Sequence, residues 1–148
     1  MDGFKEFFTE AAELQKNLQD TLKKVPASHA KLIKGFKFKW VNDSTIPGDD
    51  DHVGIINPMK KTVTIAAPWN YGRGYTLCHE LAHQVWAAYV SPEMKKAWSK
   101  IVKLNPDRDK TENDEENFCM AYACYYSKNK VTKHDCQEWM DFIKKLPK

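Results

Sequence analysis

The chain has 148 residues, of which 42% are hydrophobic and 29% are charged, and this length and composition suit one globular domain. Its net charge is only +3, and the lysines are scattered, so nothing in the charge pattern favours a nucleic-acid or membrane surface. No stretch approaches the roughly 20 apolar residues of a membrane span. The first residues lack the basic and apolar regions of a signal peptide. We therefore expect a protein that is cytoplasmic at synthesis, with its four cysteines as free thiols.

The N-terminal segment, residues 1–33, is predicted to be helical. Apolar residues recur at three- and four-residue spacing from Phe4 to Leu22, the period of a helix with one buried face. Pro26 ends this helix, and residues 27–33 are expected to form a second, shorter one.

A small sheet is predicted over residues 35–67. Residues 35–41 alternate apolar and basic side chains, the pattern of a strand with one wet face. Two β-rich runs, residues 53–56 and 62–66, flank Asn57-Pro58-Met59-Lys60 and predict a hairpin. We expect these strands to form a mostly antiparallel sheet.

Helices are predicted over most of the remaining chain. The first covers residues 72–90. Ser91 and Pro92 then have the N-cap and first-turn proline of a helix that runs to about Leu104. Two further helices are expected within residues 92–146, one through about Lys128 and one ending near Pro147. Asn113 or Asp114 is expected to cap the first of these helices, and the second is expected to start at Thr132 or Asp135.

This order of elements predicts a single α+β domain over residues 1–148. The sheet is expected to pack on the helix of residues 72–90. The helices of residues 92–146 then lie on the C-terminal side.

One motif indicates a chemistry. His79-Glu80-Leu81-Ala82-His83 lies within a predicted helix, Tyr75 to Val90. Residues four apart on a helix project from one face, so both imidazoles can bind one metal ion. Zinc is the usual metal of such a site, and the glutamate of the motif is the usual general base.

Two histidines do not complete a catalytic zinc site, which usually has three protein ligands and one open position. His134 is the only later histidine and lies 51 residues after His83. Carboxylates are better placed, because an antiparallel helix packed on the motif helix would direct one of them at the metal. The candidates at the start of the predicted helix are Glu112, Asp114, Glu115 and Glu116.

The helix that begins Glu116-Asn117-Phe118-Cys119-Met120-Ala121-Tyr122 resembles the ligand helix of the gluzincin metallopeptidases. More narrowly, residues 62–126 resemble the compact catalytic domains related to anthrax lethal factor and to Pro-Pro endopeptidases. The resemblance implies a zincin-like fold in which His79, His83 and Glu116 hold Zn²⁺.

The same resemblance implies an activity and a substrate. The activity is hydrolysis of peptide bonds, with Glu80 as the general base. The strand Lys61 to Ala67 would match the edge strand along which a zincin binds its peptide by strand addition.

Two neighbouring families share parts of the pattern. Thr76 to His83 is similar to the SprT-like DNA-associated proteases, whose third ligand is a histidine with no clear counterpart here. The ImmA-type peptidases carry a Glu-x-Asn-x-Phe-Ala helix, which would nominate Glu115 instead of Glu116. Adjacent helical residues point about 100° apart, so we expect only one of the two to be the ligand, and we choose Glu116.

The group related to lethal factor carries an oxyanion-stabilising tyrosine about seven residues before the glutamate ligand, and here that position is Asp109. The role could fall to His134, Tyr122 or Tyr75, or be absent. A further aromatic set could line a substrate cleft, although core packing explains most of its members equally well. Its members are Trp69, Tyr71, Tyr75 and Trp86.

Two functions are therefore compared. The first is a zinc metalloendopeptidase that processes a narrow set of protein or peptide substrates. The second is a zincin-like module of weak or no activity, retained for binding or structure beside a partner protein in a larger assembly such as a virus particle.

Overall fold

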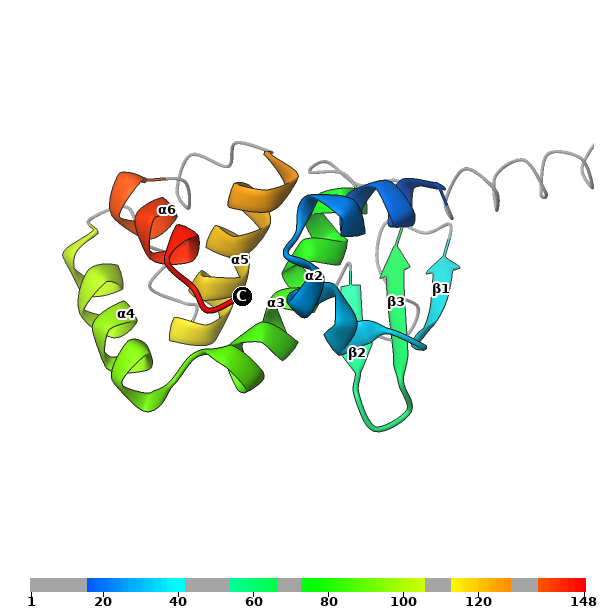
Figure 1. Ribbon diagram of the computed structural model, residues 1–148, viewed down its shortest axis with the longest axis horizontal. Helices are drawn as coiled ribbons and strands as arrows, with labels where there is room; N and C mark the ends of the chain where they lie inside the picture. Colours follow the sequence, from blue (N-terminus) through cyan, green and yellow to red (C-terminus); the bar gives the residue numbers. More distant parts are fainter. Residues whose placement is uncertain (1–15, 42–53, 67–72, 106–112, 129–135) are drawn as a thin grey trace, which may run out of the picture.

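The computed structural model describes residues 16–41, 54–66, 73–105, 113–128 and 136–148. In chain order they form a helix over residues 16–24, α2 (Ala27–Ala30), the 3-10 helix η1 (Lys31–Ile33), β1 (Lys37–Val41), β2 (Gly54–Asn57), β3 (Thr62–Ala66), α3 (Arg73–Tyr89), α4 (Pro92–Leu104), α5 (Asp114–Ser127) and α6 (Gln137–Lys144). The fold is α+β, as predicted. Figure 1 shows α3 in the middle, between the sheet and the helices α4, α5 and α6. In the described ranges no helix has the length and apolar character to cross a membrane.

The sheet has three strands in the order β1-β3-β2. β2 and β3 form the predicted antiparallel hairpin. β1 pairs with the other side of β3 in parallel, with Lys37 opposite Thr62 and Val41 opposite Ala66. The prediction of a mostly antiparallel sheet was wrong, because β2 does not pair with β1, the strand that precedes it in the chain. The described sheet is mixed.

β3 is the central strand, so the expectation that Lys61 to Ala67 forms an edge strand was also wrong. Its side chains Val63 and Ile65 are buried in the core, as expected for a strand with neighbours on both sides. β2 occupies the edge nearest the histidine motif. Its residues 54–56 line the same pocket as His79 and His83.

Side-chain caps begin α4 and α5 where the sequence predicts them. The backbone N–H of Met94 donates to Ser91 Oγ at 3.2 Å, and the backbone N–H of Glu116 donates to Asn113 Oδ1 at 2.8 Å. Each bond satisfies an N–H that has no acceptor within its own helix. The cap at Asn113 therefore sets which residues occupy the first turn of α5.

The last helix begins later than predicted. Cys136 holds the N-cap position of α6 without a side-chain cap hydrogen bond, and the helix ends at Lys144. The predicted first residues Thr132 and Asp135 lie outside the described residues. The helix also stops before Pro147, near which its end was expected.

The contact between α3 and α5 is the most extensive between any two described elements. Both helices join one buried cluster with α4 and α6, in which Trp98 and Trp139 are fully buried with ring centroids 5.1 Å apart. Burial of a side chain of that size contributes roughly 4–6 kcal/mol at about 25 cal/mol per Å². This core fixes α5 firmly beside the motif helix.

His29 connects the N-terminal segment to this core, a role that the sequence did not reveal. It is 0% exposed, with Nδ1 2.9 Å from the Tyr122 hydroxyl and Nε2 2.7 Å from the Pro147 carbonyl oxygen. Since a carbonyl oxygen can only accept, Nε2–H donates to Pro147 and the Tyr122 hydroxyl donates to Nδ1. The contact joins α2, α5 and the C-terminal residues.

Candidate metal centre

The motif helix α3 buries one face and presents its histidines on another. Leu77, Leu81 and Val85 are at most 1% exposed, and they hold the helix against the core. The side chains of His79 and His83 are 16% and 21% exposed. The helical spacing therefore brings the two imidazoles together at the surface, with ring centroids 5.4 Å apart, as the motif predicts.

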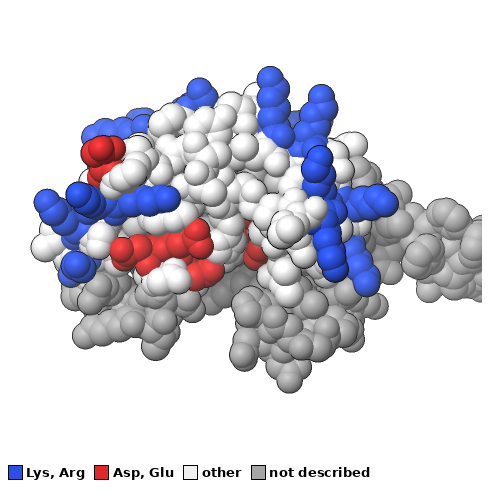
Figure 2. All heavy atoms as spheres, turned by 90° about the horizontal axis from the view of Figure 1, so that it is seen from below, with Lys and Arg blue, Asp and Glu red and all other residues white. Residues whose placement is uncertain are grey.

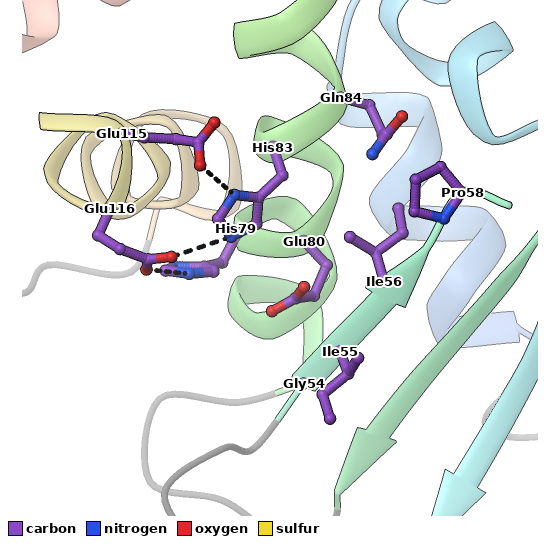
Figure 3. Close-up of a pocket in the computed structure, with 10 residues that line it drawn as sticks. All are labelled: Gly54, Ile55, Ile56, Pro58, His79, Glu80, His83, Gln84, Glu115 and Glu116. Carbon is purple, nitrogen blue, oxygen red and sulfur yellow. Dashed lines mark hydrogen bonds and ion pairs between the residues drawn. The ribbon is translucent and has the colours of Figure 1, made fainter. Parts of the chain in front are cut away.

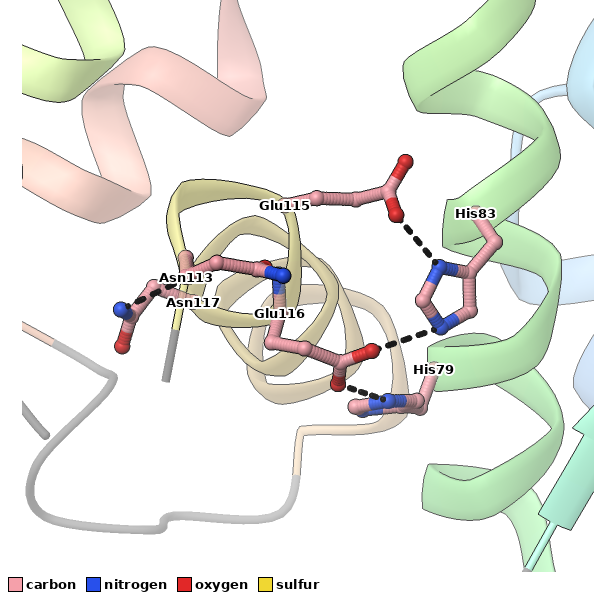
Figure 4. Close-up of polar contacts among 6 residues, drawn as sticks. All are labelled: His79, His83, Asn113, Glu115, Glu116 and Asn117. Atoms are coloured by element: carbon pink, nitrogen blue, oxygen red, sulfur yellow. Dashed lines mark hydrogen bonds and ion pairs between the residues drawn. The ribbon is translucent and has the colours of Figure 1, made fainter. Parts of the chain in front are cut away.

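Glu116 joins the two histidines. Its Oε2 lies 3.1 Å from Nε2 of His79, and its Oε1 lies 3.2 Å from Nε2 of His83 (Figure 4). The Asn113 cap places this residue in the first turn of α5, and the packing of α5 on α3 turns the carboxylate toward the rings. One carboxylate thus bridges the two imidazoles, with one oxygen on each ring.

The spacing of these atoms fits a metal ion. Two ligand atoms that are each about 2.0–2.1 Å from a tetrahedral zinc ion lie about 3.3 Å apart. The contacts of Glu116 with the two Nε2 atoms, at 3.1 and 3.2 Å, are close to this separation. Two imidazoles and one carboxylate are also a donor set that catalytic zinc accepts. His79, His83 and Glu116 can therefore hold a divalent metal.

Glu115 also reaches the site, although the sequence led us to expect only one of the two glutamates there as a ligand. Its Oε2 lies 3.4 Å from Nδ1 of His83. The adjacent glutamates therefore contact different nitrogens of one ring (Figure 4). Glu116 contacts Nε2 of both histidines, which face the candidate metal position, and Glu115 contacts the outer nitrogen of His83, Nδ1.

The charges at the site are strongly coupled. Burial lowers the pKa of His83, but the hydrogen bond to Glu116 and the negative charges of the neighbouring glutamates outweigh it and raise this pKa to about 9. The hydrogen bonds to His79 and His83 hold the pKa of Glu116 well below its ordinary value. In the metal-free protein at neutral pH, His83 is thus a cation paired with Glu116. A metal ion must displace its proton.

The site opens into a pocket of about 460 Å³. One wall is the edge strand β2 with the turn that follows it, and the other is formed by α3 and the start of α5 (Figure 3). The lining residues are Gly54, Ile55, Ile56, Pro58, His79, Glu80, His83, Gln84, Glu115 and Glu116. An apolar strand thus faces a polar wall that carries the candidate metal ligands.

Acidic side chains gather near the middle of one face in Figure 2, with Lys and Arg side chains on either side. The first turn of α5 contributes three adjacent acidic residues, Asp114, Glu115 and Glu116. Such a surface raises the local concentration of cations.

Gly54 lets β2 approach the general-base candidate closely. A Cβ atom at this position would lie 2.7 Å from Cγ2 of Thr76 and 3.0 Å from both Cγ and Oε1 of Glu80. The 2.7 Å contact is too short for a real side chain, so any residue other than glycine requires the Thr76 side chain or β2 to shift, and the 3.0 Å contacts require the Glu80 side chain to give way. Glu80 is 6% exposed and its carboxylate points into the pocket beside β2 (Figure 3).

Cys119 is a residue of the site that sequence reasoning missed. Its thiol lies within 4.8 Å of ligand atoms of His79 and His83, and it is 0% exposed. Burial and the nearby carboxylates raise its pKa well above the ordinary value. The signal was available, since Cys119 follows Glu115 by four residues on one helix face. Glu116 fits better as the third ligand, because it contacts both rings and lines the pocket.

None of the three candidates for the oxyanion stabiliser is among the described residues that line the pocket. The hydroxyl of Tyr122 is buried against His29, and Tyr122 does not line the pocket. The Tyr75 ring is 6.5 Å from that of His79 and is 6% exposed. His134 and Asp109 are not among the described residues.

The aromatic set proposed for a substrate cleft does not assemble at the pocket in the described residues. Trp86 packs on Phe118, with ring centroids 5.1 Å apart, and lies beneath Lys95. Trp69 and Tyr71 are outside the described ranges.

Comparison of the chain with protein-family models, curated proteins and solved structures found no match. The function is therefore inferred from the residues and geometry of the site.

Proposed function

We propose that this chain is a zinc-dependent metalloendopeptidase of the gluzincin type. The observation that carries the proposal is the contact of one carboxylate, Glu116, with Nε2 of both His79 and His83 at 3.1 and 3.2 Å. Glu80, which belongs to the same helix, opens into the same pocket. These four residues are the minimal set for hydrolysis at a zinc centre.

His79, His83 and Glu116 would hold the metal, and a bound zinc ion supplies Lewis-acid activation of water and of a carbonyl group. Glu80 accepts a proton from the attacking water and transfers it to the amine nitrogen as the C–N bond breaks. The low exposure of Glu80 keeps its carboxylate within the pocket and restricts its contact with bulk water.

The edge strand β2 is the proposed binding surface for the substrate. Within the described sheet, β2 pairs with β3 on one side only, and its first residue approaches Glu80 closely. An extended peptide that pairs with the free side of β2 would pass Glu80 and the histidines. The apolar side chains Ile55 and Ile56 favour a partly apolar peptide.

A second candidate is a metal-binding module with weak or no activity. It is favoured by one observation: none of the described residues that line the pocket carries a hydroxyl group that could stabilise an oxyanion. In this case the metal would fasten α5 to α3, and the pocket would bind a partner protein without cleaving it.

The two candidates are separated by metal analysis and peptide cleavage on wild type, Glu80→Gln and Glu116→Gln. Glu138→Gln, an exposed change on α6, is the matched control. For the peptidase, wild type and control bind zinc and cleave peptides of a random library, Glu80→Gln binds zinc without cleavage, and Glu116→Gln loses zinc. Zinc binding by wild type without cleavage of any library peptide would favour the module.

A further inference from the structure

The two glutamates at the start of α5 contact opposite sides of one imidazole ring. Oε1 of Glu116 lies 3.2 Å from Nε2 of His83, and Oε2 of Glu115 lies 3.4 Å from Nδ1 of the same ring. In Figure 4 the Glu115 carboxylate lies next to the upper nitrogen of the His83 ring and the Glu116 carboxylate next to the lower one. Adjacent helical residues point about 100° apart, which lets the two carboxylates flank the ring.

We propose that Glu115 is a positioning residue, which accepts the Nδ1–H of His83 and so directs Nε2 of that ring at the metal. The proposal rests on the proposed function of the site as a metal centre. It gives the two adjacent glutamates separate roles, with Glu116 as ligand and Glu115 as the group that orients a ligand.

The chemistry of imidazole supports this division. A neutral imidazole has one N–H and one lone pair, so a carboxylate that accepts Nδ1–H leaves the lone pair on Nε2. Metal-bound histidines commonly donate their second N–H to a carboxylate, which also raises their basicity as ligands. Because Nδ1 and Nε2 lie on different edges of the ring, Glu115 is on the side turned away from the candidate metal position.

The side-chain exposures fit the same roles. The Glu115 side chain is 39% exposed and that of Glu116 is 29% exposed, so Glu115 lies nearer the rim. Substitution at Glu115 should therefore leave the fold intact, and its effect should be confined to the His83 ring.

The test compares Glu115→Ala and Glu115→Gln with the control Asp114→Asn, which removes a neighbouring charge from the same helical turn. Proteins stripped of metal with a chelator are titrated with zinc against a competing chelator, and their folding is checked by circular dichroism. We expect Glu115→Ala to bind zinc roughly 10–100-fold more weakly than wild type. Glu115→Gln, which keeps an acceptor oxygen, should recover part of the loss, and Asp114→Asn should bind like wild type.

A second measurement uses cobalt in place of zinc. The Nδ1–H protons of coordinated histidines give shifted, exchangeable NMR signals in a cobalt protein. The His83 signal should persist in wild type and Asp114→Asn, and should broaden by exchange with water in Glu115→Ala, which has lost the acceptor. The signal that broadens in Glu115→Ala while the other histidine signal persists is then assigned to His83.

Several outcomes would overturn the proposal. Zinc affinity in Glu115→Ala equal to that in Asp114→Asn would show that the carboxylate does not position His83. Complete loss of zinc, as expected for Glu116→Gln, would show that Glu115 is itself a ligand. Zinc uptake by wild type without peptide cleavage overturns the peptidase alone, whereas failure of wild type to bind zinc overturns both.

Discussion

Oε2 of Glu116 lies 3.1 Å from Nε2 of His79, although 37 residues separate them in the chain. The contact depends on two features of the fold: the Asn113 cap, which fixes the first turn of α5, and the packing of α5 along α3. A hydrogen bond in the metal-free protein thus holds two of the three ligands in place. Metal binding at such a site requires little rearrangement of the backbone.

Zinc should stabilise the wild-type protein through this site. A ligand that binds only the folded state adds about 2.7 kcal/mol to the free energy of unfolding at 100 times its Kd. We expect the melting temperature of wild type to rise with zinc concentration and that of Glu116→Ala to stay constant. Thermal denaturation monitored by circular dichroism measures this. An equal rise in both proteins would place the metal elsewhere.

The metal-free protein should lose stability as the pH rises above neutrality. His83 has a folded-state pKa of about 9 against an ordinary value of 6.5. Its protonation therefore contributes stability that is fully present below pH 6.5 and is lost as the pH rises to about 9. Urea denaturation in the presence of a chelator should show this decline in wild type. The His83→Gln variant, which cannot hold the proton, should show a flatter dependence over that range.

Gly54→Ala should impair catalysis more than metal binding. The added methyl group would lie 2.7 Å from Cγ2 of Thr76 and 3.0 Å from Oε1 of Glu80, so the Thr76 and Glu80 side chains or the start of β2 must move. A displacement of about 1 Å at a reacting group can cost on the order of 100-fold in rate. We expect kcat for peptide cleavage to fall by 10–100-fold, with zinc content unchanged. The control Gly35→Ala changes a glycine with no atom near its Cβ position but with a φ of +83°, which reports the effect of fold strain alone.

Acid should destabilise the protein through His29. Burial holds the pKa of His29 below 6.5 in the folded state, so the unfolded chain binds its proton first as the pH falls. Stability is then lost as the pH falls from about 6.5 toward the folded-state pKa. Urea denaturation between pH 6.5 and pH 5.5, where the contribution of His83 no longer changes, should show a steeper decline for wild type than for His29→Gln. Parallel declines would assign the acid sensitivity to other groups.

Removal of the hydroxyl at Tyr122 should also be costly. Tyr122→Phe leaves the buried Nδ1 of His29 without its donor, which typically costs about 1–3 kcal/mol. We expect this loss in the free energy of unfolding and no change in zinc affinity, because the hydroxyl faces His29 and not the pocket. If Tyr122→Phe instead lost peptide cleavage and kept the stability of wild type, the Tyr122 hydroxyl would have a role in catalysis.

Local sequence patterns were sufficient for the features that depend on neighbours in the chain. The spacing of His79, Glu80 and His83 placed two imidazoles on one helix face, because the helical period is fixed by backbone geometry. The caps at Ser91 and Asn113 are likewise set within four residues, by one side chain and one N–H. The resemblance to gluzincins led to the choice of Glu116 as the third ligand. The contacts of Glu116 with both histidines support this choice.

Only the tertiary structure decided the relationships between distant segments. Strand order is not encoded within any one strand, so the parallel pairing of β1 with β3 and the edge position of β2 could not be read from their alternation. The separate contacts of Glu115 and Glu116 depend on the rotation of α5 about its axis, which is held by the packing of Phe118 against Trp86 of α3 and Trp98 of α4. The contacts of His29 with Tyr122 and Pro147, and the approach of Cys119 to the histidines, also join segments that are distant in the chain. The sequence determined which groups the site can use, and helix packing decided which atom of each group faces the metal.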